Sequence, residues 1–171
     1  MMAIHHVVAL VVALIGCVTD LRTRRIPNVL TFSAAAAAVV FHGVNTGLAG
    51  IGHSLSGLAV GLVLFLPLFA LRGLGGGDVK LLAALGAWMG PGATVWMALW
   101  AALAGGPLAL VVAFSRGYLR KALENVWSLL MFWRIAGLRP HPSVNLSTPG
   151  APRLPYALPI AVGLVVTLWT R

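Results

Sequence analysis

The sequence has few charged residues, and acidic residues are the scarcest. Of 171 residues, 9% are charged and 60% are hydrophobic, and only three are acidic. The mean hydropathy is +0.96. Soluble domains usually carry about a quarter charged residues, so this composition excludes an ordinary soluble protein and indicates an integral membrane protein. No part of the chain is separately polar, and we therefore expect one domain over residues 1–171.

Cysteine is also nearly absent, with Cys17 as its only representative. A single cysteine excludes an internal disulfide and a CxxC-type zinc site. The five histidines are spread along the chain without an HExxH motif or an i,i+4 pair, so they do not suggest a metal site. We expect neither a metal nor an organic cofactor.

Six apolar stretches predict an all-α, polytopic membrane protein. A spanning helix needs about 20 mostly apolar residues, and linkers with glycine or proline separate most of the candidates. The expected transmembrane segments are Ala3–Thr19, Asn28–Val44, His53–Leu71, Val79–Gly90, Ala93–Ser115 and Pro155–Thr170. The fourth is short for a span.

The basic residues fall almost entirely on one side of these six helices. Linkers 20–27, 72–78 and 116–154 share that side. Together with Lys80 they hold eleven of the twelve Lys and Arg residues: Arg22, Arg24, Arg25, Arg72, Lys80, Arg116, Arg120, Lys121, Arg134, Arg139 and Arg153. The positive-inside rule makes this side cytoplasmic and puts both termini outside. The net charge of +9 then favours anionic lipid, and not nucleic acid, as a partner.

The stretch "LIGC" at 14–17 resembles a lipoprotein cleavage site, which would make Cys17 the mature N-terminus. A signal peptide wants basic residues before its apolar run. Here the arginines follow the run, and we favour a retained helix.

Residues 116–136 predict an amphipathic helix lying in the cytoplasmic interface. Arg116, Arg120 and Glu124 share one helical face, while leucine, valine and tryptophan occupy another. Both a plain surface anchor and a substrate-docking element fit this pattern. The Pro- and Ser-rich stretch 139–155 predicts an irregular loop, so the cytoplasmic insertion covers residues 116–154.

Two of the three acidic residues flank predicted helices on the same side of the membrane. Asp20 follows the first span and Asp78 precedes the fourth. Two neighbouring carboxyl groups cannot both ionise easily and would share one proton, as in aspartic peptide hydrolysis. Helix-end charges favour Asp78 as the base and Asp20 as the acid, although coupled groups titrate as a pair.

Simpler interpretations exist for each residue alone. Asp20 could be an exposed charge paired with Arg22 or Arg24, and Asp78 could merely cap the fourth helix. Pro27 fits the first turn of the second helix. The glycines at 75–77 allow backbone angles closed to other residues and a close approach of a substrate.

Both aspartates lie in motifs that resemble those of a known family. "GGGDVKL" is similar to the GxGD motif of intramembrane aspartyl proteases, with Gly75, Gly77 and Asp78 as its defining positions. The stretch "DLRTRRIPN", with Asp20, Pro27 and Asn28, resembles the first motif of the prepilin and preflagellin peptidases, and "LPYALPIAVG" at 154–163 their final helix.

The resemblance implies that Asp20 and Asp78 are catalytic and that Gly75, Gly77, Lys80, Pro27 and Asn28 support them. It implies cleavage of a basic leader from type IV pilin-like precursors at the cytoplasmic face of the bacterial inner membrane. The first cytoplasmic loop is short and has no paired cysteines, so N-methyltransferase activity is not expected. The chain looks like the compact, peptidase-only type associated with Flp (tight-adherence) pili.

Two other functions fit a small helical bundle with ionisable residues. A proton-coupled transporter would need acids near the bilayer centre, and an internal repeat is common in such proteins. A non-catalytic scaffold of a secretion or pilus assembly would tolerate Asp→Asn at both positions.

Overall fold

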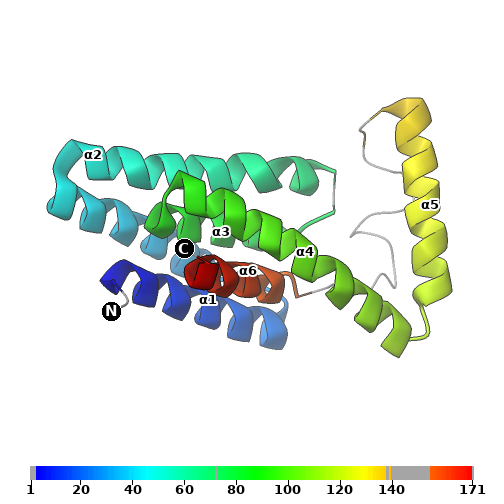
Figure 1. Ribbon diagram of the computed structural model, residues 1–171. Helices are drawn as coiled ribbons and strands as arrows, with labels where there is room; N and C mark the ends of the chain where they lie inside the picture. The colour runs from blue at the N-terminus through cyan, green and yellow to red at the C-terminus, as the bar shows by residue number, and fades with distance from the viewer. Residues whose placement is uncertain (1–2, 72, 138, 140–154, 171) are drawn as a thin grey trace.

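The computed structural model describes residues 3–71, 73–137, 139 and 155–170. These residues form six helices and no strand, which confirms the all-α prediction (Figure 1). The helices are α1 (Ile4–Thr23), α2 (Asn28–Ala70), α3 (Gly76–Met89), α4 (Pro91–Ser115), α5 (Leu119–Ala136) and α6 (Ala157–Thr170). Within the described part, α1, α2 and α4 are long and apolar enough to cross a membrane.

Helix α2 has two halves that meet at Gly47. Gly47 has φ 63° and ψ −144°, a conformation outside the helical region that glycine adopts most readily. The chain reverses direction there, so the halves run antiparallel (Figure 1). They correspond to the predicted segments Asn28–Val44 and His53–Leu71, the second of which ends one residue beyond the helix. The residues between these segments were expected to be a linker, but they are helical on both sides of the break.

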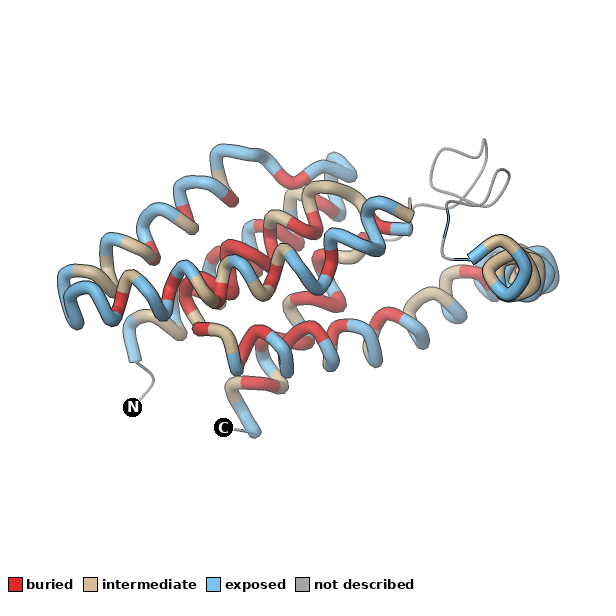
Figure 2. The backbone as a smooth tube through the Cα atoms, turned by 90° about the horizontal axis from the view of Figure 1, so that it is seen from above, coloured by how far each residue is buried: buried red, intermediate tan, exposed pale blue. Residues whose placement is uncertain are grey.

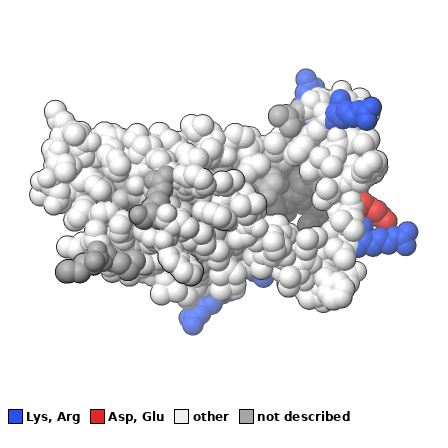
Figure 3. Space-filling model, viewed as in Figure 1, with Lys and Arg blue, Asp and Glu red and all other residues white. Residues whose placement is uncertain are grey.

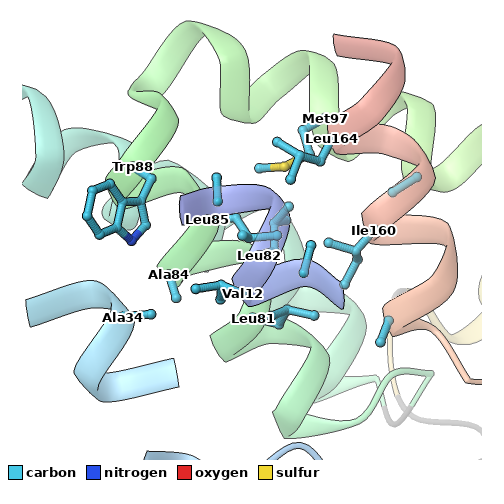
Figure 4. Close-up of a cluster of buried hydrophobic side chains, with 14 of the residues drawn as sticks. Val12, Ala34, Leu81, Leu82, Ala84, Leu85, Trp88, Met97, Ile160 and Leu164 are labelled. Atoms are coloured by element: carbon cyan, nitrogen blue, oxygen red, sulfur yellow. The ribbon is translucent and has the colours of Figure 1, made fainter. Parts of the chain in front are cut away.

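Helix α3 forms the centre of the bundle. Every residue from Leu81 to Trp88 is buried, and side chains from α1, α4 and α6 surround this stretch (Figure 4). Its fourteen residues rise about 21 Å, less than the roughly 30 Å of a bilayer core. Helix α3 can be this short because it contacts other helices over most of its surface.

Small residues allow α2 and α3 to cross closely. A Cβ atom on Gly57 would collide with the carbonyl oxygen of Gly86, and one on Gly61 would lie 2.7 Å from Ala83 Cα. Close crossings of this kind are typical of packed membrane helices. They hold the second half of α2 firmly against the central helix.

Helix α5 stands apart from the bundle. It runs perpendicular to the other helices in Figure 1 and is seen end-on in Figure 2. None of its residues is buried, and its packing partner among the described helices is α4. Lys, Arg and Glu side chains surround it, whereas the bundle surface seen in Figure 3 is almost entirely uncharged. The amphipathic helix predicted over 116–136 is confirmed from Leu119. Its position in the membrane interface stays a prediction, and 140–154 lie outside the described residues.

Candidate active site

Asp20 lies in the last turn of α1 and is buried, with 8% of its surface exposed. The first helix extends beyond the predicted end at Thr19 to Thr23. Arg24, with a left-handed φ of 55°, ends the helix and donates its N–H to the Asp20 carbonyl at 2.9 Å. Asp20 therefore lies within the last turn of the helix and not after its end, as was predicted.

The Asp20 carboxyl group faces the start of α6. The backbone amide of Ala157 interacts with it as a hydrogen-bond donor, and the charge of Arg24 acts on it. Its Oδ2 atom is buried without a hydrogen-bond partner among the described residues. The interpretation of Asp20 as an exposed charge is wrong, because the ends of α1 and α6 enclose it.

Asp78 lies in the first turn of α3 and is also 8% exposed. Its Oδ2 atom accepts the N–H of Gly75 at 3.2 Å. Gly75 is the N-cap residue, so Asp78 occupies the third helical position. From there it caps the helix start by reaching back, as the acidic partner of a capping box does. The predicted capping role is present, one turn further into the helix.

The two carboxyl groups influence one another. Burial and, after it, the charge of Asp20 raise the pKa of Asp78 to about 7. Helices α1, α3 and α6 pack against one another in pairs, which brings together three chain segments far apart in the sequence.

The surroundings of the pair favour the reverse of the predicted acid and base roles. Arg24 and the Ala157 amide both favour a charge on Asp20, whereas on Asp78 only the Gly75 amide acts in that direction. This favours Asp78 as the protonated member of the pair, and the acid and base roles stay a prediction.

The glycines before Asp78 serve close packing instead of unusual backbone angles. Gly75 has φ −77°, and neither Gly76 nor Gly77 has a positive φ. A Cβ atom on Gly75 would lie 3.0 Å from Asp78 Oδ2, and one on Gly77 would lie 3.2 Å from Ile26 Cβ. The prediction of special backbone angles is wrong, because the chain enters α3 directly from an extended residue.

The remaining motif residues connect α3 to the start of α2. Lys80 Nζ donates to Asn28 Oδ1 at 2.9 Å and lies 5.5 Å from the centre of the Phe32 ring. Pro27 directly precedes α2 as its N-cap residue, one position earlier than predicted. Lys80 thus binds the second motif to the first.

Three residues near the acids were given no role at the site from the sequence. Cys17 Sγ donates to the Ala157 carbonyl at 3.1 Å, Ala157 also faces Asp20, and the charge of Asp78 acts on the Tyr156 phenol. Tyr156 and Ala157 lie in the stretch "LPYALPIAVG" that resembles the final helix of the family, whereas Cys17 carries no such signal.

The histidines are not dispersed in space. His5, His6, His42 and His53 form a chain of ring contacts with centroid separations of 4.2 to 5.8 Å. His42 Nε2 lies 3.1 Å from the Trp88 carbonyl oxygen. The fifth histidine lies outside the described residues. Within the described ranges, no group of three or more His, Cys, Asp or Glu residues could hold a metal ion.

A bundle of apolar helices that buries two interacting carboxyl groups has the features of a membrane peptidase. The chain belongs to the type IV leader peptidase family, because a sequence model of that family matches residues 7–110, more than half of its length. The matched region contains both aspartates. No curated protein and no solved structure matches the chain.

Proposed function

We propose that this protein is a membrane-embedded aspartic endopeptidase that removes the basic leader from type IV pilin-like precursors. The observation that carries the proposal is the burial of Asp20 and Asp78 at one site, where the charge of one raises the pKa of the other. Membership of a leader peptidase family supports the same reaction.

The two carboxyl groups would hydrolyse a peptide bond while sharing one proton. Asp20, as the ionised member, takes a proton from a water molecule whose oxygen attacks the peptide carbonyl carbon. Asp78, as the protonated member, donates to the carbonyl oxygen. When the C–N bond breaks, the leaving nitrogen takes up the proton that Asp20 accepted from water, and the former carbonyl oxygen returns its proton to Asp78. The products are a carboxylic acid and an amine, and the pair again shares one proton. No cofactor is needed for this balance.

The supporting residues hold the pair in position. Gly75 and Gly77 leave room beside Asp78 and Ile26. Lys80, Asn28 and Pro27 fix the start of α2 against the first turn of α3. We assign them a positioning role within a single peptidase domain over residues 1–171.

We propose that the site faces the cytoplasm in a bacterial inner membrane. The basic residues flank the ends of the helices that carry the aspartates, and both termini lie toward the other end of the bundle (Figure 1). Six spans, with α2 contributing two, fit this orientation. Helix α5 would lie along anionic lipid with its basic residues in the headgroup layer. The short link between α1 and α2 carries no methyltransferase region.

The test is cleavage of a co-expressed pilin-type precursor by the wild type, Asp20→Asn and Asp78→Asn, with membrane insertion of each variant verified. Loss of an acid or base group costs on the order of 10⁴-fold at the upper end, so each single variant should leave the precursor uncleaved. Normal cleavage by either inserted variant would contradict the paired mechanism. His53→Gln, at the other end of the bundle, is the control and should cleave normally.

A further inference from the structure

Tyr156 directly precedes α6, whose first residue contacts the end of α1. The carbonyl oxygen of the next residue, Ala157, accepts a hydrogen bond from Cys17 Sγ at 3.1 Å. The Ala157 amide donates to the Asp20 carboxyl group. The Tyr156 carbonyl oxygen accepts the Ile160 N–H at 3.2 Å, within the first turn of α6. The backbone of Tyr156 is therefore fixed with respect to Asp20.

Packing against α2 and α4 sets the direction of the Tyr156 ring. The ring meets the buried Phe65 edge-on, with centroids 5.8 Å apart and planes at 68°. Its hydroxyl end lies against α4 at Gly105, where a Cβ atom would come within 2.9 Å of both the ring carbon Cε2 and the phenol oxygen. Gly105 leaves the space that this edge of the ring and its hydroxyl occupy.

The charge of Asp78 acts on the phenol of this ring. A phenol has an ordinary pKa of about 10, and a protonated phenol is a hydrogen-bond donor. Tyr156 thus keeps a neutral donor beside a pair of carboxyl groups.

We propose that the Tyr156 hydroxyl donates a hydrogen bond to the carbonyl oxygen of the peptide bond under attack. This rests on the proposed peptidase function. The oxygen of that carbonyl gains negative charge as water adds to the carbon, and a fixed donor aimed at it lowers the barrier. Protonated Asp78 would bind the same oxygen from the α3 side, so the two donors together complete an oxyanion site built from α3 and α6.

The direct test is Tyr156→Phe, which removes the hydroxyl and keeps the ring against Phe65. Loss of one oxyanion donor costs about 10²-fold or more in kcat, and we expect that loss in kcat with KM nearly unchanged. Tyr118→Phe is the matched control, since it removes the other tyrosine hydroxyl of the chain. The Tyr118 hydroxyl accepts a hydrogen bond from Asn125 Nδ2 of α5 at 3.0 Å, and the Tyr118→Phe variant should cleave at the wild-type rate.

A second variant tests the position of the hydroxyl without removing it. Gly105→Ala would push against the ring carbon Cε2 and the phenol oxygen, which displaces the hydroxyl and should also lower kcat. Added to Tyr156→Phe, the same change should cost clearly less than it does in the wild type, because no hydroxyl remains to be displaced. Extraction yield and melting temperature in detergent show whether each variant is folded.

The outcomes separate this inference from the function on which it rests. Wild-type cleavage that Asp20→Asn and Asp78→Asn abolish, together with an unchanged kcat in folded Tyr156→Phe, would overturn the role of Tyr156 alone. A rise in KM at constant kcat would also overturn it, because the hydroxyl would then contribute equally to binding of the substrate and of the transition state. No cleavage by the wild type would refute the proposed function.

Discussion

The two ends of the bundle both collect titratable side chains, but in opposite ways. Asp20 and Asp78 are each 8% exposed and sit where three helix ends converge. Four histidines gather near the start of α1 and the turn of α2, and none of them is buried. Asp20 lies about 22 Å further along α1 than His5, at 1.5 Å per residue. One helix therefore links both ends.

The two ends differ in how far they shield their ionisable side chains from solvent. The histidines are partly accessible and are packed ring against ring. The aspartates are enclosed, and one of their oxygens has no hydrogen-bond partner among the described residues. Burying a carboxyl group in this way lowers the stability of the fold. The loss occurs at the end of the bundle where the proposed chemistry needs buried carboxyl groups.

The largest effect on stability should come from removing the carboxyl group of Asp78. It lies at the end of the bundle that holds Asp20 and Asp78, called the acid end below. Burial raises the pKa of Asp78 to about 7, against an ordinary value near 3.9. Between these values the folded protein binds more protons than the unfolded one, so stability falls as pH rises from about 4 to 7. Asp78→Asn should remove most of this fall.

The measurement is the melting temperature in detergent across that pH range. Wild type should melt progressively lower toward pH 7, and Asp78→Asn should melt above wild type at pH 8. Identical pH profiles for the two proteins would show that Asp78 is not held in a desolvated site. Glu124→Gln, on the exposed face of α5, should leave the profile unchanged.

A glycine substitution at the α2–α3 crossing should destabilise the connection between the two ends. Gly57→Ala inserts a methyl group against the Gly86 carbonyl, and overpacking of this kind costs about 1 to 3 kcal/mol. Gly52→Ala, on the same helix with nothing within 4 Å, is the matched control. Equal melting temperatures for the two variants would refute the close crossing.

At the end of the bundle that holds the four histidines, a substitution should lower stability while leaving cleavage nearly unchanged. His42→Phe keeps an aromatic ring beside Phe41 and Trp88 but removes the nitrogen that lies 3.1 Å from the Trp88 carbonyl oxygen. A buried carbonyl without its partner costs about 1 to 3 kcal/mol at most. Cleavage by the folded variant should stay within about twofold of wild type, and a larger loss of cleavage would mean that the two ends are functionally coupled.

The smallest effect is expected for Lys80→Met. It removes an exposed hydrogen bond to Asn28 and a contact over Phe32, worth about 1 kcal/mol. The methionine retains the apolar stem, and Asn28→Ala should produce a similar loss of stability. If the pair acts together, the double variant should lose little more than either single variant. Fully additive losses would show that the two residues act separately.

The sequence predicts most of the acid end because hydropathy boundaries mark it. The first apolar run stops beside Asp20, the fourth starts at Asp78, and the basic residues put both boundaries on one side. The contribution of α6 could not be predicted in this way. Tyr156 and Ala157 acquire their places only through docking of α6 against α1, and hydropathy does not report which helix ends touch.

Two further features of the structure differ from the sequence prediction, and they also result from tertiary packing. The linker between the first and second halves of α2 remains helical because one residue, Gly47, supplies the reversal. The glycines at 75–77 suggested unusual dihedral angles, yet Gly75 and Gly77 are small because Asp78 and Ile26 lie against them. The histidine contacts were likewise hidden, since they join α1 to both halves of α2.

The most direct test of the central claim compares cleavage of a pilin-type precursor by Asp20→Asn, Asp78→Asn and the double variant. If the two carboxyl groups share one proton and act as a unit, each single variant loses nearly all activity and the double variant loses no more. If each single variant keeps a substantial rate and the two losses multiply in the double variant, the aspartates act independently, which would contradict a shared site.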